Sequence, residues 1–451
     1  GWDIVGGGGY PGTAWDIYIK GNTKTILNNT VARWTYGGSF SGVIEGNSSN
    51  TLNSGIVDTL EGTGYTGRRV YGDGRTTVNN GQVDWFLSGG GWDDLLVTGN
   101  VAVTVYDGVI NASLGASYGV ASSHTINGNS DNRVFGGNFS GTPRTGSNGF
   151  SGGVTNNGRL LGNASLTLDL RNYDGEFALP SGTNISGGNP FNSTNIVGTD
   201  SSNTITLNIY TKPGSDALNG ATIYGDGGRT ASNTRSGKIY MNIQAEGSSI
   251  GNLYTTYYSN ISSSQILRDV EMRVQGAKSI NGISGGNASD NFTNTIVANS
   301  SNQVKMNFGE NVDGTASYQT DPIAVTGLGI VNFTELNVTN GIKLMANGGD
   351  IKNGRSATAA NHATTYHQFG DIHLSKNAGI GISSATNLIS GAKLTVEDEG
   401  TIESPPGTGR INLSDFATPD TDKDHLTWLK TTTNDAGSRV NSQGTWFGAV
   451  S

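Results

Sequence analysis

The feature that most constrains this chain is a triplet of apolar residues at alternate positions, which recurs along the sequence. The middle residues of successive triplets lie 65, 39, 34, 31 and 34 positions apart. Alternation of this kind predicts strands with one buried face, and a fixed period near 35 residues predicts a repeat architecture. The triplets are Val101-Val103-Val105, Leu166-Leu168-Leu170, Ile205-Leu207-Ile209, Ile239-Met241-Ile243, Val270-Met272-Val274 and Val304-Met306-Phe308.

A second motif, an apolar or aromatic residue followed by Gly and small polar residues, lies between the triplets. Tyr224 of this motif precedes Met241 by 17 residues, about half of the period. Each repeat is therefore expected to carry at least two short strands, with Gly and Asn supplying positive φ at the corners. The motif occurs at 34–38, 70–75, 134–138, 185–189, 223–229 and 283–287.

These two motifs predict an all-β chain folded as a parallel β-solenoid. Each coil pairs with its neighbours, so a hydrophobic content of only 34% suffices and 70 Gly serve as corner residues. Residues 1–404 are expected to form the solenoid with its N-terminal cap, and 405–451 a capping segment of the same domain. The Gly- and Ser-rich stretches 141–158 and 211–220 are expected to be loops extruded from the coils.

Composition excludes several classes of protein. No apolar run approaches the 18 residues of a membrane-spanning helix, and a net charge of −9 argues against nucleic acid as a partner. The absence of Cys excludes disulfides and thiolate metal sites, and the five His are too scattered to predict a metal site. Because the chain begins at Gly1 without Met, a processed or excised fragment is expected, with any signal or wall anchor outside it.

Four carboxylates are candidates for chemistry. Asp93 and Asp94 follow a Gly-Gly-Gly-Trp segment, and Asp73 and Asp226 take equivalent places in a Tyr-Gly-Asp-Gly motif. Paired carboxylates could hydrolyse a glycosidic bond or hold Ca²⁺ beside a uronate. Adjacent strand residues point to opposite faces, so Asp93 and Asp94 converge only if the chain turns there. For Asp73 and Asp226 the favoured interpretation is a turn in which the carboxylate accepts backbone hydrogen bonds.

Aromatic and basic side chains are the candidates for ligand binding. Exposed aromatic faces stack on sugar rings, and guanidinium groups bind carboxylates, so a glycan, including an acidic one, would suit such a site. Packing of the Trp residues against the solenoid, and surface solubility for each Arg, are the alternatives. The candidates are Trp85, Trp92, Tyr254, Tyr257 and Tyr258 among the aromatics and Arg68, Arg69 and Arg75 among the basic residues.

The Tyr-Gly-Asp-Gly and Phe-Gly-Gly-Asn steps alternate with Leu-Thr-Leu-Asp-Leu and Ile-Tyr-Met-Asn-Ile strands. In this pattern the chain resembles the pectate-lyase-like adhesive domains of Gram-positive surface proteins and the binding regions of serine-rich repeat adhesins. The resemblance covers roughly residues 15–400. It implies a right-handed parallel β-helix at the cell wall that binds host or matrix glycans or glycoproteins. The chain lacks the Gly-His-Gly and Arg-Ile-Lys triplets usual in polygalacturonases, which share this fold class.

Three functions follow as hypotheses. The first is an extracellular, wall-anchored adhesin domain, monomeric within a longer surface protein, with no covalent chemistry and no cofactor, although calcium is an open candidate. The second is a polysaccharide lyase or glycoside hydrolase that uses Asp93, Asp94 or Asp73 with a nearby Arg or Lys. The third is a structural stalk or autotransporter passenger.

Overall fold

The computed structural model describes residues 2–8, 17–118, 123–139, 149–155, 158–175, 177, 179–189, 196–198, 200–227, 237–256, 268–287, 303–310, 322–331, 333–352, 371–383, 388–390, 393–396, 401–403, 410–411 and 429–431. These residues form strands and connecting turns, without a helix. The chain divides into two compact units: unit 1 is Gly1–Lys212 with Gly220–Tyr240, and unit 2 is Pro213–Asn219 with Met241–Ser451.

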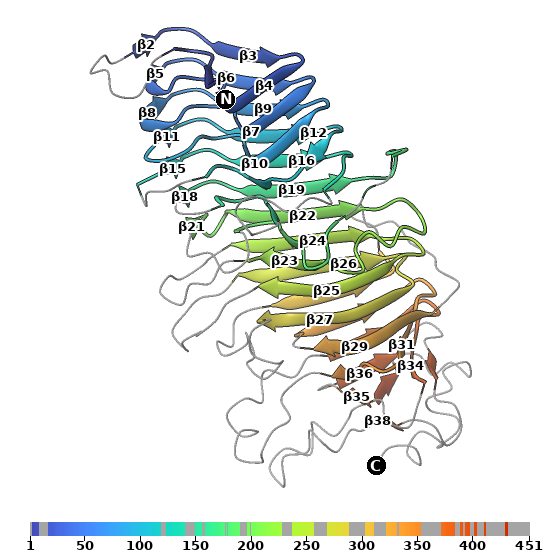
Figure 1. The fold of residues 1–451 in the computed structure, drawn as a ribbon. Coiled ribbons are helices and arrows are strands. Elements are labelled where there is room, and N and C mark those ends of the chain that lie inside the picture. Colours follow the sequence, from blue (N-terminus) through green and yellow to red (C-terminus); the bar gives the residue numbers. More distant parts are fainter. Residues whose placement is uncertain are drawn as a thin grey trace. The chain divides into compact units, whose positions relative to one another are not determined.

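Unit 1 is a parallel β-solenoid whose coils each place one strand, or a pair of short strands, in sheets A, B and C in turn (Figure 1). Among its described residues the strand pairings are parallel, for example β4 with β7 and β9 with β12. Sheet A contains β1 (Ile4–Val5), β4 (Thr30–Tyr36), β7 (Gly55–Glu61), β10 (Gln82–Ser88), β13 (Val109–Ile110), β14 (Ser113–Gly115), β17 (Gly149–Ser151), β20 (Asn184–Ser186) and β23 (Thr222–Asp226).

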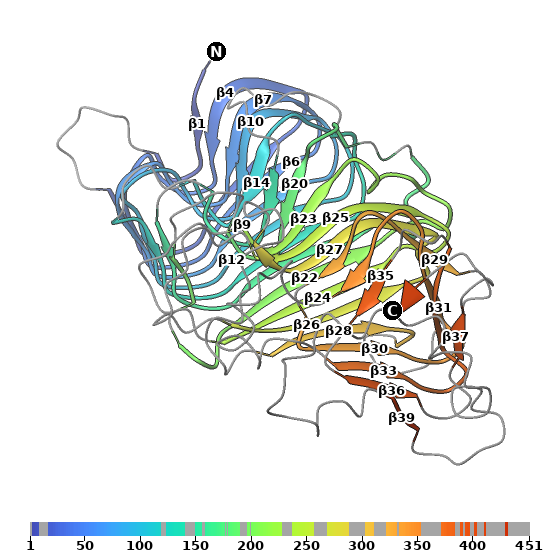
Figure 2. The same ribbon diagram turned by 90° about the horizontal axis from the view of Figure 1, so that it is seen from below.

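Sheets B and C form the other two sides of each coil; in Figure 2, β4, β7 and β10 lie on one side and β9 and β12 on another. Sheet B contains β2 (Ile17–Ile19), β5 (Ser41–Ile44), β8 (Thr66–Val70), β11 (Leu96–Val97), β15 (Thr125–Ile126), β18 (Arg159–Leu160) and β21 (Ile196–Val197). Sheet C contains β3 (Thr23–Leu27), β6 (Ser48–Leu52), β9 (Gly74–Val78), β12 (Val101–Val105), β16 (Ser130–Val134), β19 (Ala164–Asp169) and β22 (Thr204–Tyr210). The predicted right-handed parallel β-helix is confirmed.

Unit 2 contains two parallel sheets, and the division between the units falls within the sequence of β24 (Lys238–Gln244). One sheet contains β25 (Ser249–Thr256), β27 (Ser279–Asn287), β29 (Ile323–Val331), β31 (Lys343–Ala346), β32 (Ile351–Lys352), β34 (Gly379–Ile382), β35 (Leu388–Ser390), β37 (Thr401–Glu403) and β38 (Arg410–Ile411). The other contains β26 (Asp269–Gln275), β28 (Val304–Phe308), β30 (Glu335–Val338), β33 (Asp371–Leu374), β36 (Lys393–Val396) and β39 (Leu429–Thr431).

The apolar triplets form the core as predicted, since each of their residues is at most 3% exposed. The long first interval contains an additional coil, β16, whose inward residues include Ser130 and Asn132 in place of two apolar residues. One predicted alignment was wrong by two positions, because Leu166 rather than Leu168 lies opposite Leu207.

Polar residues also occupy the core of unit 1. At the central inward position of four sheet C strands, a Thr or Asn side chain crosses the interior and donates to the last carbonyl of a sheet A strand. Three of these carbonyls, those of Tyr36, Glu61 and Ser88, also accept a backbone N–H, so there the bond adds a second donor and gives the buried side chain a partner. They are Thr25–Tyr36, Asn50–Glu61, Thr76–Ser88 and Asn132–Ser151, with lengths of 2.5–3.2 Å.

Glycines at the corners of the coils have two different structural causes. At the corner from sheet C to sheet A the chain needs positive φ, as at Gly55, where φ is 117°. At the corner after sheet A the requirement is space: a Cβ on Gly62 would overlap the Gly89 carbonyl oxygen and lie 2.6 Å from the Arg75 backbone nitrogen. The expectation that corner glycines adopt positive φ is therefore right for the corner from sheet C to sheet A and wrong for the corner after sheet A.

The predicted loops differ from the structure in part. The stretch 141–158 contains a strand, β17, so it is not a single extruded loop. In the stretch 211–220, residues 213–219 pack within unit 2, where Gly214 donates to the Glu246 carbonyl and Gly251 donates to the Leu218 carbonyl. Of the expected cap at 405–451, only β38 and β39 belong to the described residues.

Candidate functional site

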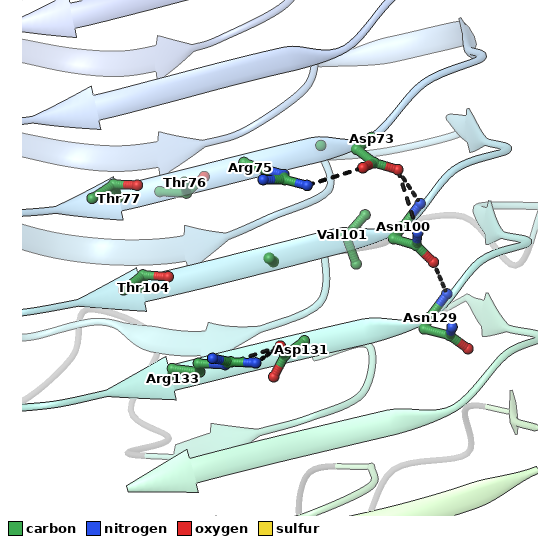
Figure 3. A pocket seen from close by; sticks show the side chains of 12 residues that line it. Asp73, Arg75, Thr76, Thr77, Asn100, Val101, Thr104, Asn129, Asp131 and Arg133 are labelled. Atoms are coloured by element: carbon green, nitrogen blue, oxygen red, sulfur yellow. Dashed lines mark hydrogen bonds and ion pairs between the residues drawn. The ribbon is translucent and has the colours of Figure 1, made fainter. Parts of the chain in front are cut away.

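A polar groove of about 530 Å³ lies on the outer face of sheet C in unit 1 (Figure 3). It spans three neighbouring strands, β9, β12 and β16, and the turns that precede them. Its lining residues are Asp73, Gly74, Arg75, Thr76, Thr77, Asn100, Val101, Ala102, Thr104, Asn129, Asp131 and Arg133. We call this feature the sheet C groove.

Strand register explains why the face is hollow at this point. Ala102 of β12 lies between Arg75 of β9 and Asp131 of β16, and all three side chains point outward. Because neighbouring strands are about 4.8 Å apart, the two longer side chains stand roughly 9.6 Å apart on either side of a methyl group. Thr77 and Thr104, one outward position further along, add hydroxyl groups to the groove.

One end of the groove is formed by a ladder of amide side chains at the corner between sheets B and C. In each coil the Oδ1 of an Asn or Asp accepts the backbone N–H of the equivalent residue in the next coil, at 2.8–2.9 Å. The ladder links the turns that precede the seven sheet C strands of unit 1, from β3 to β22. Its members are Asn22, Asn47, Asp73, Asn100, Asn129 and Asn163, and the last bond comes from the Thr204 N–H.

Two ion pairs give the groove its fixed charges. Arg75 Nη2 is 3.2 Å from Oδ2 of Asp73, and Arg133 donates from Nε and Nη2 to Oδ2 of Asp131 at 2.9 and 2.6 Å. The neighbouring Asp131 raises the pKa of the Arg133 guanidinium. Ser165 donates to the other oxygen of Asp131 at 2.9 Å. Each charged side chain is thus held by a partner on its own strand or next to it.

The groove therefore presents fixed hydrogen-bond donors and acceptors on a rigid sheet. Both arginines retain unused N–H donors, because neither pair engages the whole guanidinium. Carboxylate, amide and hydroxyl oxygens around them accept hydrogen bonds. Such an arrangement can bind a ligand rich in hydroxyl groups, and it holds no apolar pocket for a hydrocarbon.

The structure places only two of the sequence-predicted residues, Asp73 and Arg75, in this groove. Arg69 lies on β8 of sheet B, where its guanidinium packs over the Tyr71 ring at 5.3 Å and donates to its hydroxyl. Arg68 is also on β8, and its side chain lies outside what the structure describes. The expected positive cluster is thus divided between two sheets.

Trp85 and Trp92 do lie close together, with ring centroids 5.3 Å apart, as the sequence predicted. Trp92 also contacts Tyr65, Phe86 and Tyr118 at centroid distances of 6.0, 5.0 and 4.4 Å. With four rings around it, Trp92 has little free face for a sugar, and this geometry favours packing over ligand binding.

A buried acid, Glu61, lies beside this aromatic cluster and is not apparent from the sequence. Its side chain is 0% exposed, and neither carboxyl oxygen has a hydrogen-bond partner among the described residues. Burial raises the pKa of Glu61 well above its ordinary value. Glu61 in turn raises the pKa values of Tyr36 and Tyr65, for which burial is the larger cause.

The remaining carboxylates occupy separate places. Asp226 is fully buried at the end of β23 and accepts the Asn189 N–H at 3.0 Å, so it is not equivalent to Asp73, contrary to the sequence alignment of the two motifs. The chain bends at Asp93 and Asp94, and the Asp93 carbonyl lies 2.9 Å from Nδ1 of the buried His124. Within the described ranges, no three His, Asp or Glu residues are grouped to hold a metal ion.

The predicted tyrosine cluster can be placed only in part. Tyr254, near the end of β25 in unit 2, is 7% exposed, and burial raises its pKa. Tyr257 and Tyr258 lie outside the described residues. Tyr254 therefore presents little of its ring to a ligand.

The sequence contains a signal for the groove that the motif search missed. A Gly-Asn pair, or Gly-Asp in one coil, precedes each of the first six strands of sheet C, at 21–22, 46–47, 72–73, 99–100, 128–129 and 162–163. The spacing grows from 25 to 34 residues, so a search for one constant period does not find it. Asn100, Asn129, Asp131 and Arg133 follow from this repeat once its register is known.

The fold and the groove define a parallel β-solenoid with a polar surface site. No protein-family model, curated protein or solved structure matches this chain. Among the residues that the structure describes, no helix is long and apolar enough to cross a membrane.

Proposed function

We propose that this chain is the carbohydrate-binding β-solenoid of a bacterial cell-surface adhesin, and that the sheet C groove binds a glycan non-covalently. The observation that carries the proposal is the groove itself, in which two arginines, two aspartates, two asparagines and neighbouring threonine hydroxyls surround about 530 Å³. Sugar hydroxyls both donate and accept hydrogen bonds, so they match such a mixed lining.

Both carboxylates of the groove are held in ion pairs, and this agrees with binding without covalent chemistry. Asp73, in the turn before β9, and Asp131, on β16, are each paired with the arginine two residues further along the chain, and the groove lining contains no third acid. For the same reason the groove is proposed to work without calcium. Display at the cell surface rests on the resemblance to adhesive domains and on the solenoid fold.

The experiment is a glycan-array and calorimetric comparison of the wild type with a variant that fills the groove, Ala102→Phe. The matched control is Thr206→Phe, an outward position in the middle of β22 in the same row of the sheet but outside the groove. We expect Ala102→Phe to weaken glycan binding at least tenfold and Thr206→Phe to leave it unchanged.

Two outcomes would reject the proposal: an array on which the wild type binds no glycan, or bound glycans whose affinity Ala102→Phe does not alter. The same samples are incubated with uronate polysaccharides and followed by ultraviolet absorbance for unsaturated products. Formation of such products by the wild type would replace non-covalent binding with lyase activity. Glycan binding is also measured in the presence of a chelator. Loss of affinity there would contradict the proposal that the groove works without calcium.

A further inference from the structure

The groove carries a balanced charge, and this balance identifies the class of glycan that it accepts. Its ionisable lining residues are Asp73, Arg75, Asp131 and Arg133, two acids and two bases. The two pairs stand on opposite sides of Ala102, so no part of the groove is lined by positive charge alone.

The arginines are also the more exposed members of the pairs. The side chains of Arg75 and Arg133 are 67% and 53% exposed, against 25% and 43% for Asp73 and Asp131. A ligand therefore meets guanidinium N–H groups first, but a carboxylate on that ligand would also meet the two aspartates behind them. Repulsion by each aspartate therefore offsets part of the attraction that its arginine exerts on a ligand carboxylate.

We infer that the sheet C groove selects neutral, hydroxyl-rich glycans and discriminates against uronate polymers, because each guanidinium is already compensated by an aspartate. This inference rests on the proposed function of the groove. It also assigns Asp73 two roles, as a member of the amide ladder that accepts the Asn100 N–H through Oδ1 and as the counter-charge of Arg75 through Oδ2.

The two roles of Asp73 can be separated by one substitution. In Asp73→Asn the side-chain oxygen can still accept the Asn100 N–H, as Asn47, Asn100 and Asn129 do for the coils that follow them. The charge that compensates Arg75 is removed, so the groove gains one net positive charge while its backbone is held as before. An isolated exposed charge of this kind changes binding modestly.

A matched control exists on the same face. Asp169 on β19 pairs with Arg171 through bonds of 2.6 and 2.8 Å, and neither residue lines the groove. Asp169→Asn therefore changes the net charge of the chain by the same amount and releases an arginine outside the site. Any effect of Asp73→Asn that Asp169→Asn shares is a general effect of charge.

The test uses the full chain and pairs of polysaccharides that differ only in charge, such as polygalacturonate and its carboxyl-reduced form. We expect the wild type to bind neutral members at least tenfold more tightly than uronate members. Asp73→Asn should strengthen uronate binding about two- to fivefold, in a salt-sensitive manner, and Asp169→Asn should not.

Preference of the wild type for uronates, or no gain in Asp73→Asn, would overturn the charge inference while leaving glycan binding in place. Failure of the proposed function is a different result, in which no polysaccharide of either class binds and Ala102→Phe has no effect. That result would remove the inference as well.

Discussion

Gly62 offers a direct test of the close approach of sheets A and C behind the groove. The residue follows β7, and its backbone φ does not lie in the positive region, so alanine is not excluded by conformation. The added Cβ would instead overlap the Gly89 carbonyl oxygen and lie 2.6 and 2.8 Å from the Arg75 backbone nitrogen and carbonyl carbon. Gly62→Ala therefore introduces a steric conflict with two backbone segments at once.

The size of the effect follows from the atoms involved. A flexible side chain could rotate away, but backbone atoms of β9 and of the Gly89 turn are held in strand ladders on both sides. The cost should lie at the upper end of the range for overpacking, about 3 kcal/mol in the free energy of unfolding. For a unit of this size each kcal/mol lowers Tm by about 2–4 °C, which gives a decrease of about 6–12 °C.

The assay is thermal and denaturant unfolding followed by tryptophan fluorescence, with Gly21→Ala as the control. A Cβ on Gly21 has no atom within 4 Å, and its φ is not in the positive region, so this variant should match or slightly exceed the wild type in stability. If Gly62→Ala and Gly21→Ala unfolded alike, the sheets would not be in backbone contact, and lack of space would not explain the glycine at the corner after sheet A.

Three further predictions concern buried and ladder residues. Burial raises the folded-state pKa of Glu61, so its contribution to stability is complete below its ordinary pKa and is lost as pH rises through the raised value. In denaturation measured across pH, Glu61→Gln should reduce this loss of stability. A pH profile identical to that of the wild type would contradict the prediction. Asp73→Ala removes the acceptor of the Asn100 N–H, so it should lower the free energy of unfolding by about 1 kcal/mol and speed hydrogen exchange at the Asn100 amide. If the Asn100 amide were equally protected in Asp73→Ala and Asp73→Asn, the ladder bond would be unimportant. Asn132→Leu should destabilise by about 1–3 kcal/mol in spite of its added apolar area, because the Ser151 carbonyl loses its donor, and a stabilised variant would refute that account.

The sequence was most informative where each coil buries apolar residues in alternation. Strands β12, β19 and β22 follow from the Val, Leu and Ile triplets, because a period of two identifies a half-buried strand without knowledge of its neighbours. Strands β6 and β9 were missed. Their inward positions include Asn50 and Thr76, polar residues whose hydrogen bonds to carbonyls of sheet A are not apparent from the sequence.

The site was less accessible to sequence reasoning than the fold. Asp73 and Arg75 were found because they are adjacent in one motif, but Asp131 and Arg133 lie about 58 residues further along the chain. Only the register of β9, β12 and β16 brings the two pairs to one face. Trp92 was identified as a candidate for ligand binding, yet Tyr65 and Tyr118 from the neighbouring coils pack against it, which favours a packing role.

By itself the sequence determined that this protein is a cysteine-free, glycine-rich parallel solenoid, because alternation, repeat length and turn residues are local properties of the chain. Tertiary structure decided which glycines adopt positive φ and which leave space for the backbone of another strand, since the space around a glycine depends on residues in other strands. It also decided the charge of the groove. Whether an arginine is free or compensated depends on the aspartate that the fold places beside it, and on the small side chain that the next coil places between the pairs.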